Sequence, residues 1–321
     1  MQQQTLAAPH AAAPPRRRKL DLLPYLMVAP ALLAIGIFSL LPTVYGMVIS
    51  VYRVEFVQLL TFVGPANYID VLTDLKFWNS VRVSFIFTIA SVVMSVGFGF
   101  ALALISNQSV RFRSAFRTIA LLPWVTSYVV TYLIFRWILN ADYGLLNALF
   151  VEALGWPRVQ WLGNPVLALA SLIVVNVWRG APYAMVLLLA GLQGIPRELY
   201  EAAAIDGAGR VRSFLSITLP LMRTPLMVLI VLTTIADFNV VVAMLVLTGG
   251  GPGTATESMS LRMYYEAFVN ARMGTASAVA MLIFGINMLL TLEVTDRDHL
   301  ARVLRALRGI PETLRIQRVR A

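Results

Sequence analysis

Residues 198–209 read ELYEAAAIDGAG, and the sequence continues to ITLP at residues 217–220. This alanine-rich, charged stretch lies between two long apolar runs, one ending near Leu192 and the other beginning near Thr224. Because charged groups are costly inside a bilayer, a chain anchored in hydrocarbon on both sides of such a stretch must bring it to the membrane face. The sequence therefore predicts a helix–turn–helix on a membrane face.

The limits of the first predicted helix follow from local residue preferences. Pro196 suits the first helical turn, where its missing N–H needs no partner. Glu198 and Glu201 place negative charge near the positive end of the helix dipole. Gly207 and Gly209 take up positive φ at low steric cost, so they end this helix and turn the chain into the next.

The second predicted helix begins at about Arg210 and ends before Pro220. A re-entrant hairpin that only packs against the membrane bundle is the structural alternative, because alanine-rich helices followed by glycine are common. On the residues of this stretch alone, both interpretations stay open.

Composition places the chain in a membrane. It has 321 residues, of which 59% are hydrophobic and 13% charged, and its mean hydropathy is +0.76. A soluble domain rarely has this balance, so the predicted class is an all-α polytopic membrane protein. Without cysteine there is no disulfide or thiolate metal site, and the two histidines, His10 and His299, stand far apart in the sequence, so we expect no metal site.

Spanning helices require roughly 20 apolar residues at about 1.5 Å per residue. Apolar runs that reach or approach this length cover residues 20–51, 78–105, 118–139, 165–192, 224–248 and 275–292. The first run is too long for the apolar part of a signal peptide and has no clear cleavage site, so we expect it to be retained. These runs predict six spans with both termini on one side.

The sequence is expected to divide into three parts. Residues 1–19 form a basic tail whose composition predicts disorder, and residues 20–293 form the transmembrane domain, which contains the charged loop at 194–222. Residues 294–321 form a second basic tail. Within it, leucines and arginines at helical spacing over 298–309 predict either an interfacial basic helix or a disordered tail that only sets topology.

Arginine and lysine predict the orientation. Four precede the first span, three lie within 107–117, four lie between Arg197 and Arg223, and seven lie within 294–321, whereas each alternate loop holds one or two. By the positive-inside rule, both termini and the charged loop lie on the cytoplasmic side of the cell (inner) membrane. The net charge of +10 is therefore mainly a topology signal, and it requires no nucleic-acid partner.

The charged loop resembles the cytoplasmic coupling loop of permease subunits of binding-protein-dependent ABC importers. The resemblance rests on Glu-Ala-Ala, a glycine after three more residues, and Ile-x-Leu-Pro after nine more. The coupling residues that it implies are Glu201, Ala202, Ala203, Asp206, Gly207, Ile217, Leu219 and Pro220. It further implies that the loop docks into a cleft on a separate ATPase subunit.

A glycine run at residues 249–253 is not a nucleotide site, because it lacks the lysine and the following helix of a phosphate-binding loop. We therefore expect no cofactor on this chain, with ATP and Mg on the partner ATPase. With Leu247-Thr248 before it and residues 255–258 after it, the run resembles the outer loop of carbohydrate-type permeases. That resemblance implies contact with a binding protein; a plain glycine turn is the alternative.

Polar and aromatic side chains within the predicted spans are candidates for a substrate pathway, since they are costly against lipid. They are Asn176, Arg179, Tyr183, Asp237, Phe238, Asn239 and Asn287. Asn287 is equally well explained as an interhelical contact, and Arg179 and Asp237 as a structural ion pair. The aromatic rings are explained either by stacking on a sugar or by packing.

The resemblance to maltose-type permeases covers most of the chain from the first span onward. It is strongest at the coupling loop, residues 178–182, residues 237–239 and the glycine run. It implies the membrane subunit of a carbohydrate importer that works by alternating access. Its partners would be a second homologous permease, an ATPase dimer, an extracytoplasmic binding protein and membrane lipid. An ion-coupled secondary transporter and a membrane-embedded transferase are the alternatives.

Overall fold

The computed structural model describes residues 23–55, 58–108 and 113–294. The tails predicted at 1–19 and beyond residue 294 lie outside these residues. The chain divides into two compact units, residues 1–45 and 46–321. In the first, α1 (Leu23–Ile35) continues through the π-helical turn η1 (Gly36–Leu40) into α2 (Leu41–Ile49), whose last residues belong to the second unit.

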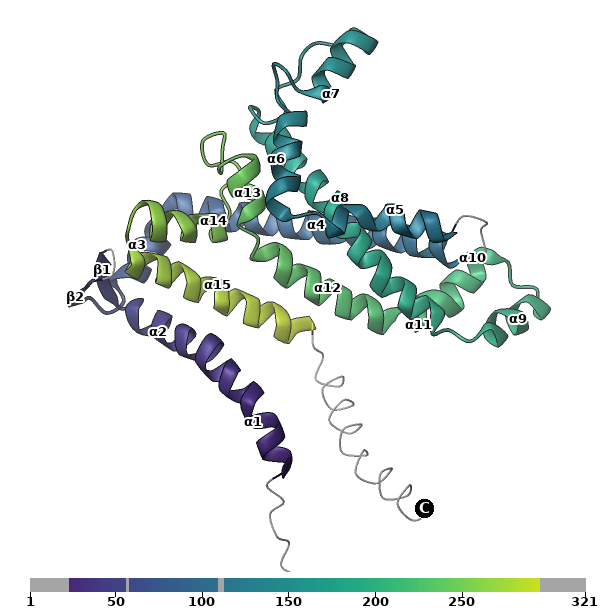
Figure 1. The fold of residues 1–321 in the computed structure, drawn as a ribbon, viewed down its shortest axis with the longest axis horizontal. Coiled ribbons are helices and arrows are strands. Elements are labelled where there is room, and N and C mark those ends of the chain that lie inside the picture. The colour runs from purple at the N-terminus through teal and green to yellow at the C-terminus, as the bar shows by residue number, and fades with distance from the viewer. Residues whose placement is uncertain (1–22, 56–57, 109–112, 295–321) are drawn as a thin grey trace, which may run out of the picture. The chain divides into compact units, whose positions relative to one another are not determined.

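Two long helices, α4 (Leu75–Asn107) and α8 (Pro165–Gln193), form the centre of the second unit and pack along much of their lengths (Figure 1). Each begins at a side-chain cap. The carboxylate of Asp74 accepts a hydrogen bond from the backbone N–H of Lys76 (2.9 Å), and the Asn164 side chain accepts one from Val166 N (3.0 Å). These caps satisfy N–H groups that a helix start leaves without partners.

Small side chains allow α4 and α8 to approach closely. At Gly99 on α4, a Cβ atom would overlap Ala184 Cβ on α8 and would lie 2.9 Å from the carbonyl oxygen of Ala181. The same helix buries a row of small hydroxyl side chains, Ser80, Ser84, Thr88, Ser91 and Ser95. Interfaces between membrane helices favour small residues because they bring the backbones into close contact.

The third apolar run, residues 118–139, was predicted to form one span, but it is not one straight helix. It forms α5 (Arg113–Val125) and α6 (Tyr128–Ile138), which meet at 92°. Pro123, near the end of α5, supplies no backbone N–H, and Ser127 is extended at the start of α6, with ψ 139°. A hydropathy run carries no information about such a change of direction.

The fifth run is also broken. The predicted span over 224–248 forms α12 (Arg223–Phe238) and the separate short helix α13 (Val242–Leu247), which packs against α6. The chain leaves the helix at Asn239, the C-terminal cap of α12. The single-helix prediction is therefore wrong beyond Phe238.

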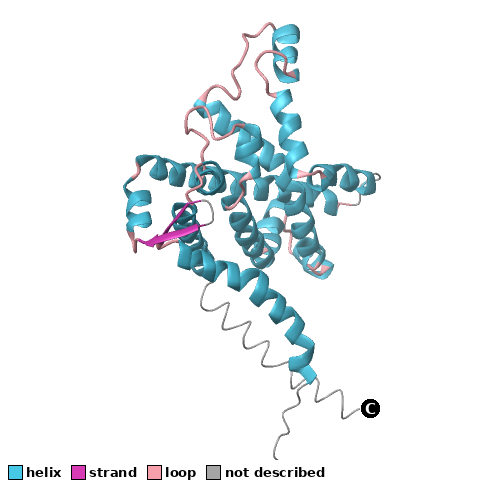
Figure 2. Ribbon diagram, turned by 60° about the vertical axis from the view of Figure 1, so that its left-hand side comes forward, coloured by secondary structure: helices cyan, strands magenta, loops and turns pink. Residues whose placement is uncertain are grey.

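A β-hairpin that the sequence did not reveal follows α2. Strands β1 (Tyr52–Glu55) and β2 (Gln58–Phe62) pair antiparallel. The described residues contain no other strand, and helices make up most of the rest of them (Figure 2). The helix α3 (Ala66–Thr73) comes next. Its Asn67 side chain donates hydrogen bonds to the carbonyl oxygens of Ser50 (2.8 Å) and Tyr52 (2.9 Å), which tie α3 to the hairpin.

Three elements close the same end of the unit. They are α14 (Met259–Tyr264), the π-helical turn η4 (Tyr265–Val269) and α15 (Met273–Val294). The helix α15 starts two residues before the predicted run at 275–292 and extends two residues beyond it, through Glu293 to Val294. Glutamate is a good helix former, so a single charge at this point does not end the helix.

A smaller element lies between α6 and α8. It contains α7 (Leu145–Ala148) and the π-helical turn η2 (Leu149–Ala153), and it projects away from the long helices (Figure 1). The buried amide of Asn147 holds it together: its nitrogen donates to the carbonyl oxygens of Ala141 and Val159, both at 2.9 Å. Its oxygen accepts from the indole N–H of Trp161 (3.0 Å).

Residues 197–221 form the predicted helix–turn–helix, with α9 (Arg197–Ile205) followed by α10 (Arg210–Ser213), η3 (Phe214–Thr218) and α11 (Leu219–Leu221). Three details differ from expectation. Pro196 is the N-cap rather than part of the first turn, and Gly209 is extended, with φ −71°. The helical path also passes through Pro220, which lies in the first turn of α11, where no N–H is needed.

By length and composition, the described residues contain four helices able to cross a membrane, or up to six if each bent pair is one span. The bent pairs are α5 with α6, and residues 210–221 with α12, the latter bent by 62°. The upper number agrees with the six spans predicted from the apolar runs.

Candidate functional site

The turn of the helix–turn–helix is a complete glycine C-cap. Gly207 has φ +75°, its N–H donates to the carbonyl oxygen of Ala204 (3.1 Å), and the N–H of Ala208 donates to that of Ala203 (2.8 Å). This is the hydrogen-bond pattern of a Schellman motif, in which the left-handed residue lies directly after the helix cap, here Asp206. The predicted positive φ at Gly207 is confirmed.

The two arms of the motif are joined and leave an apolar surface exposed. The hydroxyl groups of Tyr200 on α9 and Thr218 on η3 lie 2.8 Å apart and share a hydrogen bond. Ile205 is 87% exposed and Val211 74% exposed, although both are apolar. Exposed apolar surface is typical of interaction sites when it forms a contiguous patch.

The predicted coupling residues fall on both arms of this motif. Glu201 and Ala202 are exposed on α9, and Ala203 is half-buried; Ile217 is half-buried on η3. Leu219 and Pro220 are exposed on α11, where the chain turns toward α12. The motif thus exposes a carboxylate and several apolar side chains.

A chain of hydrogen bonds crosses the interior of the second unit. The hydroxyl of Tyr132 on α6 donates to Asn176 Oδ1 on α8 (3.0 Å), and Asn176 Nδ2 donates to Asp237 Oδ1 on α12 (3.0 Å). Tyr132 and Asn176 are buried, while Asp237 is partly exposed. Three separate helices therefore position one carboxyl group.

Arg179 does not pair with Asp237, so the structural ion-pair hypothesis is wrong for the described residues. Its guanidinium carbon instead lies 3.1 Å from the centre of the Tyr128 ring, in a cation–π contact. Its Nε is buried without a hydrogen-bond partner. The arginine thus keeps unused hydrogen-bonding capacity beside the polar chain.

The remaining pathway candidates are two asparagines that bond to each other and two aromatic residues that pack against other rings. Asn239 and Asn287 exchange reciprocal amide hydrogen bonds of 3.3 and 3.2 Å, which link the end of α12 to α15. Phe238 is 1% exposed and packs edge-on against Phe85, so its ring belongs to the core in this conformation. Tyr183 is half-buried and contacts Trp124, with ring centres 5.7 Å apart.

Residues 95–295 match the family described as the binding-protein-dependent transport system inner membrane component. The chain belongs to this family. It is therefore the permease subunit of an ABC importer, in which a separate subunit uses ATP. This membership excludes the alternatives of a secondary transporter and a transferase.

Curated relatives of this permease include three whose names state a substrate. A trehalose/maltose transport system permease of Thermococcus litoralis is 40% identical over 81% of this chain and 88% of its own length. A sulfoquinovosyl glycerol transport system permease of Agrobacterium fabrum is 30% identical, over 84% and 88%. An sn-glycerol-3-phosphate transport system permease of the same organism is 32% identical, over 84% and 92%.

Solved structures show the same fold. A chain of a bacterial alginate ABC transporter, in complex with a periplasmic protein that holds an alginate pentasaccharide, superposes on the permease with a TM-score of 0.77. The match covers 87% of this chain and 96% of that chain, at 23% identity. It confirms the predicted all-α polytopic fold.

The glycine run of the permease is a closely bonded loop attached to α4. Gly249, Gly250 and Gly253 have φ of +61°, +81° and +62°. The Thr256 hydroxyl donates to the carbonyl oxygen of Gly251 (2.7 Å), and Asn79 Nδ2 donates to that of Thr254 (2.7 Å). The loop is thus held in shape by its own threonine and held in place by α4.

An ion-pair cluster fixes the same loop. Arg262 on α14 pairs with Asp74, the cap of α4, and with Glu257 (3.3 Å). Ser80 on α4 also donates to Glu257 (3.3 Å). The sequence motifs did not reveal this cluster, because its members are spread over about 190 positions of sequence. The one available signal was that an arginine and two carboxylates lie in loops predicted to be on the same side of the membrane.

Proposed function

We propose that this permease carries a carbohydrate or a polyol derivative across the cell membrane by alternating access. The relatives support this, since the substrates in their names are a disaccharide pair, a sugar glycoside and a glycerol phosphate. The proposed assembly contains a second homologous permease, an ATPase dimer that binds ATP and Mg, and an extracytoplasmic binding protein. Alginate transporter structures with a periplasmic protein support the last of these partners.

The observation that carries the proposal is the exposed helix–turn–helix. In the proposed mechanism it docks on the ATPase with Glu201, Ala202, Ala203 and the apolar side chains around Gly207. Because Ile205 and Val211 are largely exposed, a partner surface can bury them and gain hydrophobic free energy. Closure of the ATPase dimer then moves α9 and, through Pro220, α12.

The substrate pathway is proposed to lie beside the polar chain of α6, α8 and α12. Asp237 offers oxygen acceptors, and Arg179 offers donors that no side chain in the described residues uses. Such groups recognise sugar hydroxyls by hydrogen bonds, while Tyr183 and Trp178 supply aromatic faces. Trp178 is 44% exposed, so its ring is accessible.

We expect solute-stimulated ATP hydrolysis from the reconstituted importer. With the cognate binding protein and the ATPase in proteoliposomes, at least one of trehalose, maltose, glycerol phosphate or a sugar glycoside should raise the hydrolysis rate severalfold. Rates that respond to none of these, with uptake of an amino acid or metal ion instead, would exclude a carbohydrate substrate.

The orientation is proposed to be cytoplasmic for both termini and for the helix–turn–helix. Since the chain has no cysteine, single cysteines report sidedness without background. Ile205→Cys, at an 87% exposed position, should react with an impermeant maleimide only after the cytoplasmic side is opened. Tyr143→Cys, at a 66% exposed position between α6 and α7, is the matched control and should react from outside. The reverse pattern would refute the proposed docking.

Asp237→Leu is expected to cut substrate uptake by about tenfold or more, because a hydrogen bond to a charged or strongly polar group contributes about 1.5–3 kcal/mol. The permease should still assemble with the ATPase, because Asn176 retains its bond from Tyr132. Thr233→Val is the control on the same helix: its hydroxyl bonds only to carbonyl oxygens of α12. Loss of assembly in Asp237→Leu would instead assign the carboxyl a structural role.

A further inference from the structure

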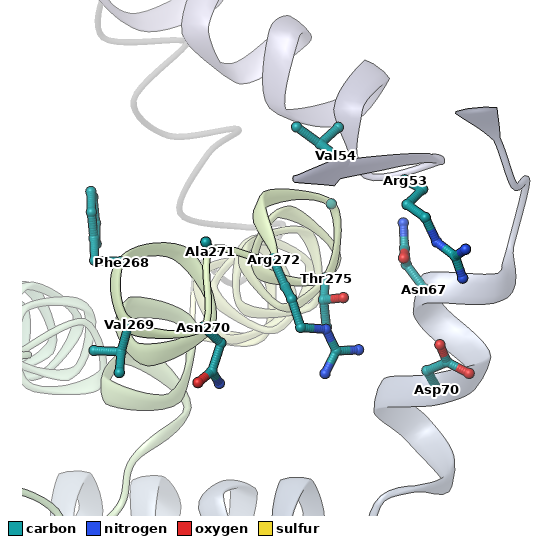
Figure 3. Close-up of a pocket in the computed structure, with 11 residues that line it drawn as sticks. Arg53, Val54, Asn67, Asp70, Phe268, Val269, Asn270, Ala271, Arg272 and Thr275 are labelled. Carbon is teal, nitrogen blue, oxygen red and sulfur yellow. The ribbon is translucent and has the colours of Figure 1, made fainter. Parts of the chain in front are cut away.

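An open polar pocket of about 680 Å³ lies where β1, α3 and the junction of η4 with α15 meet. Arg53 lines it from β1, Asp70 from α3, and Phe268, Asn270 and Arg272 from the junction. Figure 3 shows Arg272, in the junction between η4 and α15, extending toward α3, with Arg53 and Asp70 on the opposite wall. None of these residues belongs to the coupling motif or to the interior polar chain.

The walls of the pocket are fixed by the fold. Asn67 bonds to the backbone of Ser50 and Tyr52, which holds α3 against β1. At Gly274, a Cβ atom would overlap the carbonyl oxygen of Tyr52, so this glycine lets α15 lie directly against the strand. The pocket is therefore a built feature rather than a gap between loose loops.

The pocket brings two guanidinium groups together, and one of them has no ionic partner. Arg53 is exposed and forms no ion pair within the described residues. Arg272 forms an ion pair with Glu266 at 3.6 Å, and its side chain is 51% exposed. Asp70 on the same lining and Glu266 beside Arg272 balance the two guanidinium charges, so the pocket has no excess charge for a doubly charged anion such as phosphate. The N–H groups of Arg53 and of the exposed part of Arg272 are left to donate to a single carboxylate.

The rim is apolar. Phe268 is 70% exposed and Val269 is 66% exposed, on the side of the pocket formed by η4. Arginine together with an exposed aromatic ring is the combination enriched at the centres of protein–protein interfaces. A protein carboxylate surrounded by apolar surface fits these features better than a free ion does.

The elements that line the pocket, β1, α3 and the start of α15, lie at the opposite end of the second unit from the helix–turn–helix (Figure 1). If the helix–turn–helix faces the cytoplasm, the pocket faces outward, so this inference rests on the proposed function. We propose that the pocket receives an aspartate or glutamate side chain of the extracytoplasmic binding protein, held between Arg53 and Arg272 with apolar contact to Phe268.

The test is the concentration of substrate-loaded cognate binding protein that gives half-maximal ATPase stimulation. Arg53→Glu should raise this concentration about tenfold or more, because a like charge then faces the docking carboxylate. The effect should shrink as ionic strength rises. Arg158→Glu is the matched control: this arginine is 63% exposed in the loop before α8 and should change nothing.

A second variant guards against a folding artefact. Arg272→Gln removes the other guanidinium and should shift the same concentration in the same direction, and the hydrolysis rate without binding protein measures assembly of each complex. An unchanged half-maximal concentration for Arg53→Glu, with normal stimulation of the wild-type protein, would refute only the proposed docking of a carboxylate in the pocket. A wild-type complex that the binding protein does not stimulate would refute the proposed function as well.

Discussion

Gly207→Val is expected to uncouple ATP hydrolysis from transport while leaving the permease folded in the membrane. Gly207 has φ +75°, a conformation that costs an ordinary L-residue about 1–2 kcal/mol and a β-branched residue more. No atom lies within 4 Å of the position of an added Cβ, so the strain is entirely in the backbone. The turn must open, and the two arms bearing Glu201 and Val211 change their relative angle.

The expected result is a loss of about tenfold or more in substrate-stimulated hydrolysis and in uptake, measured in proteoliposomes alongside ATPase retention on the purified permease. Gly207→Asn is the matched control, because asparagine tolerates left-handed backbone and the space for it is open. Wild-type coupling in Gly207→Val would show that the motif is only a connector.

The sequence was most informative where local chemistry determines structure. Gly207 ends α9 as its composition predicted, and the apolar runs identify the positions of the spanning helices. Their directions could not be predicted. The 92° bend at residues 126–127 and the break at Asn239 lie inside continuous apolar runs, where hydropathy is the same for a straight and a broken helix.

In the candidate site, the sequence identified polar side chains inside the membrane but not which of them bond to one another. Asn176 and Asp237 were each predicted to be pathway candidates, and they bond to each other, because polar groups inside a membrane must find partners. Arg179 and Asp237 were paired by charge, yet the guanidinium stacks on Tyr128 instead. The part played by Tyr132 could not be predicted, since a tyrosine in an apolar run is ordinary and its bond to Asn176 depends on how α6 leaves the bend.

The close packing of α4 against α8 depends on Gly99, and Gly99→Val is expected to have the largest effect on stability. An added Cβ would overlap Ala184 Cβ and lie 2.9 Å from Ala181 O and 3.0 Å from Met185 N, both backbone atoms of α8. A flexible side chain could move aside, but a helix backbone cannot, so α4 and α8 must separate. Overpacking of this kind costs about 1–3 kcal/mol, which lowers the melting temperature by several degrees, to about 10 °C at most.

Gly97→Val separates this packing effect from the effect of placing valine in the helix. Gly97 lies two residues away on α4, is exposed, and has no atom within 4 Å of an added Cβ. Both variants replace a glycine of α4 by valine, so they share any change in helix propensity. Thermal unfolding of the two purified proteins in detergent should therefore differ, with Gly97→Val near wild type and Gly99→Val well below it. Equal melting temperatures would mean that α4 and α8 do not pack this closely in the membrane, and that the contact between them contributes little to holding the bundle together.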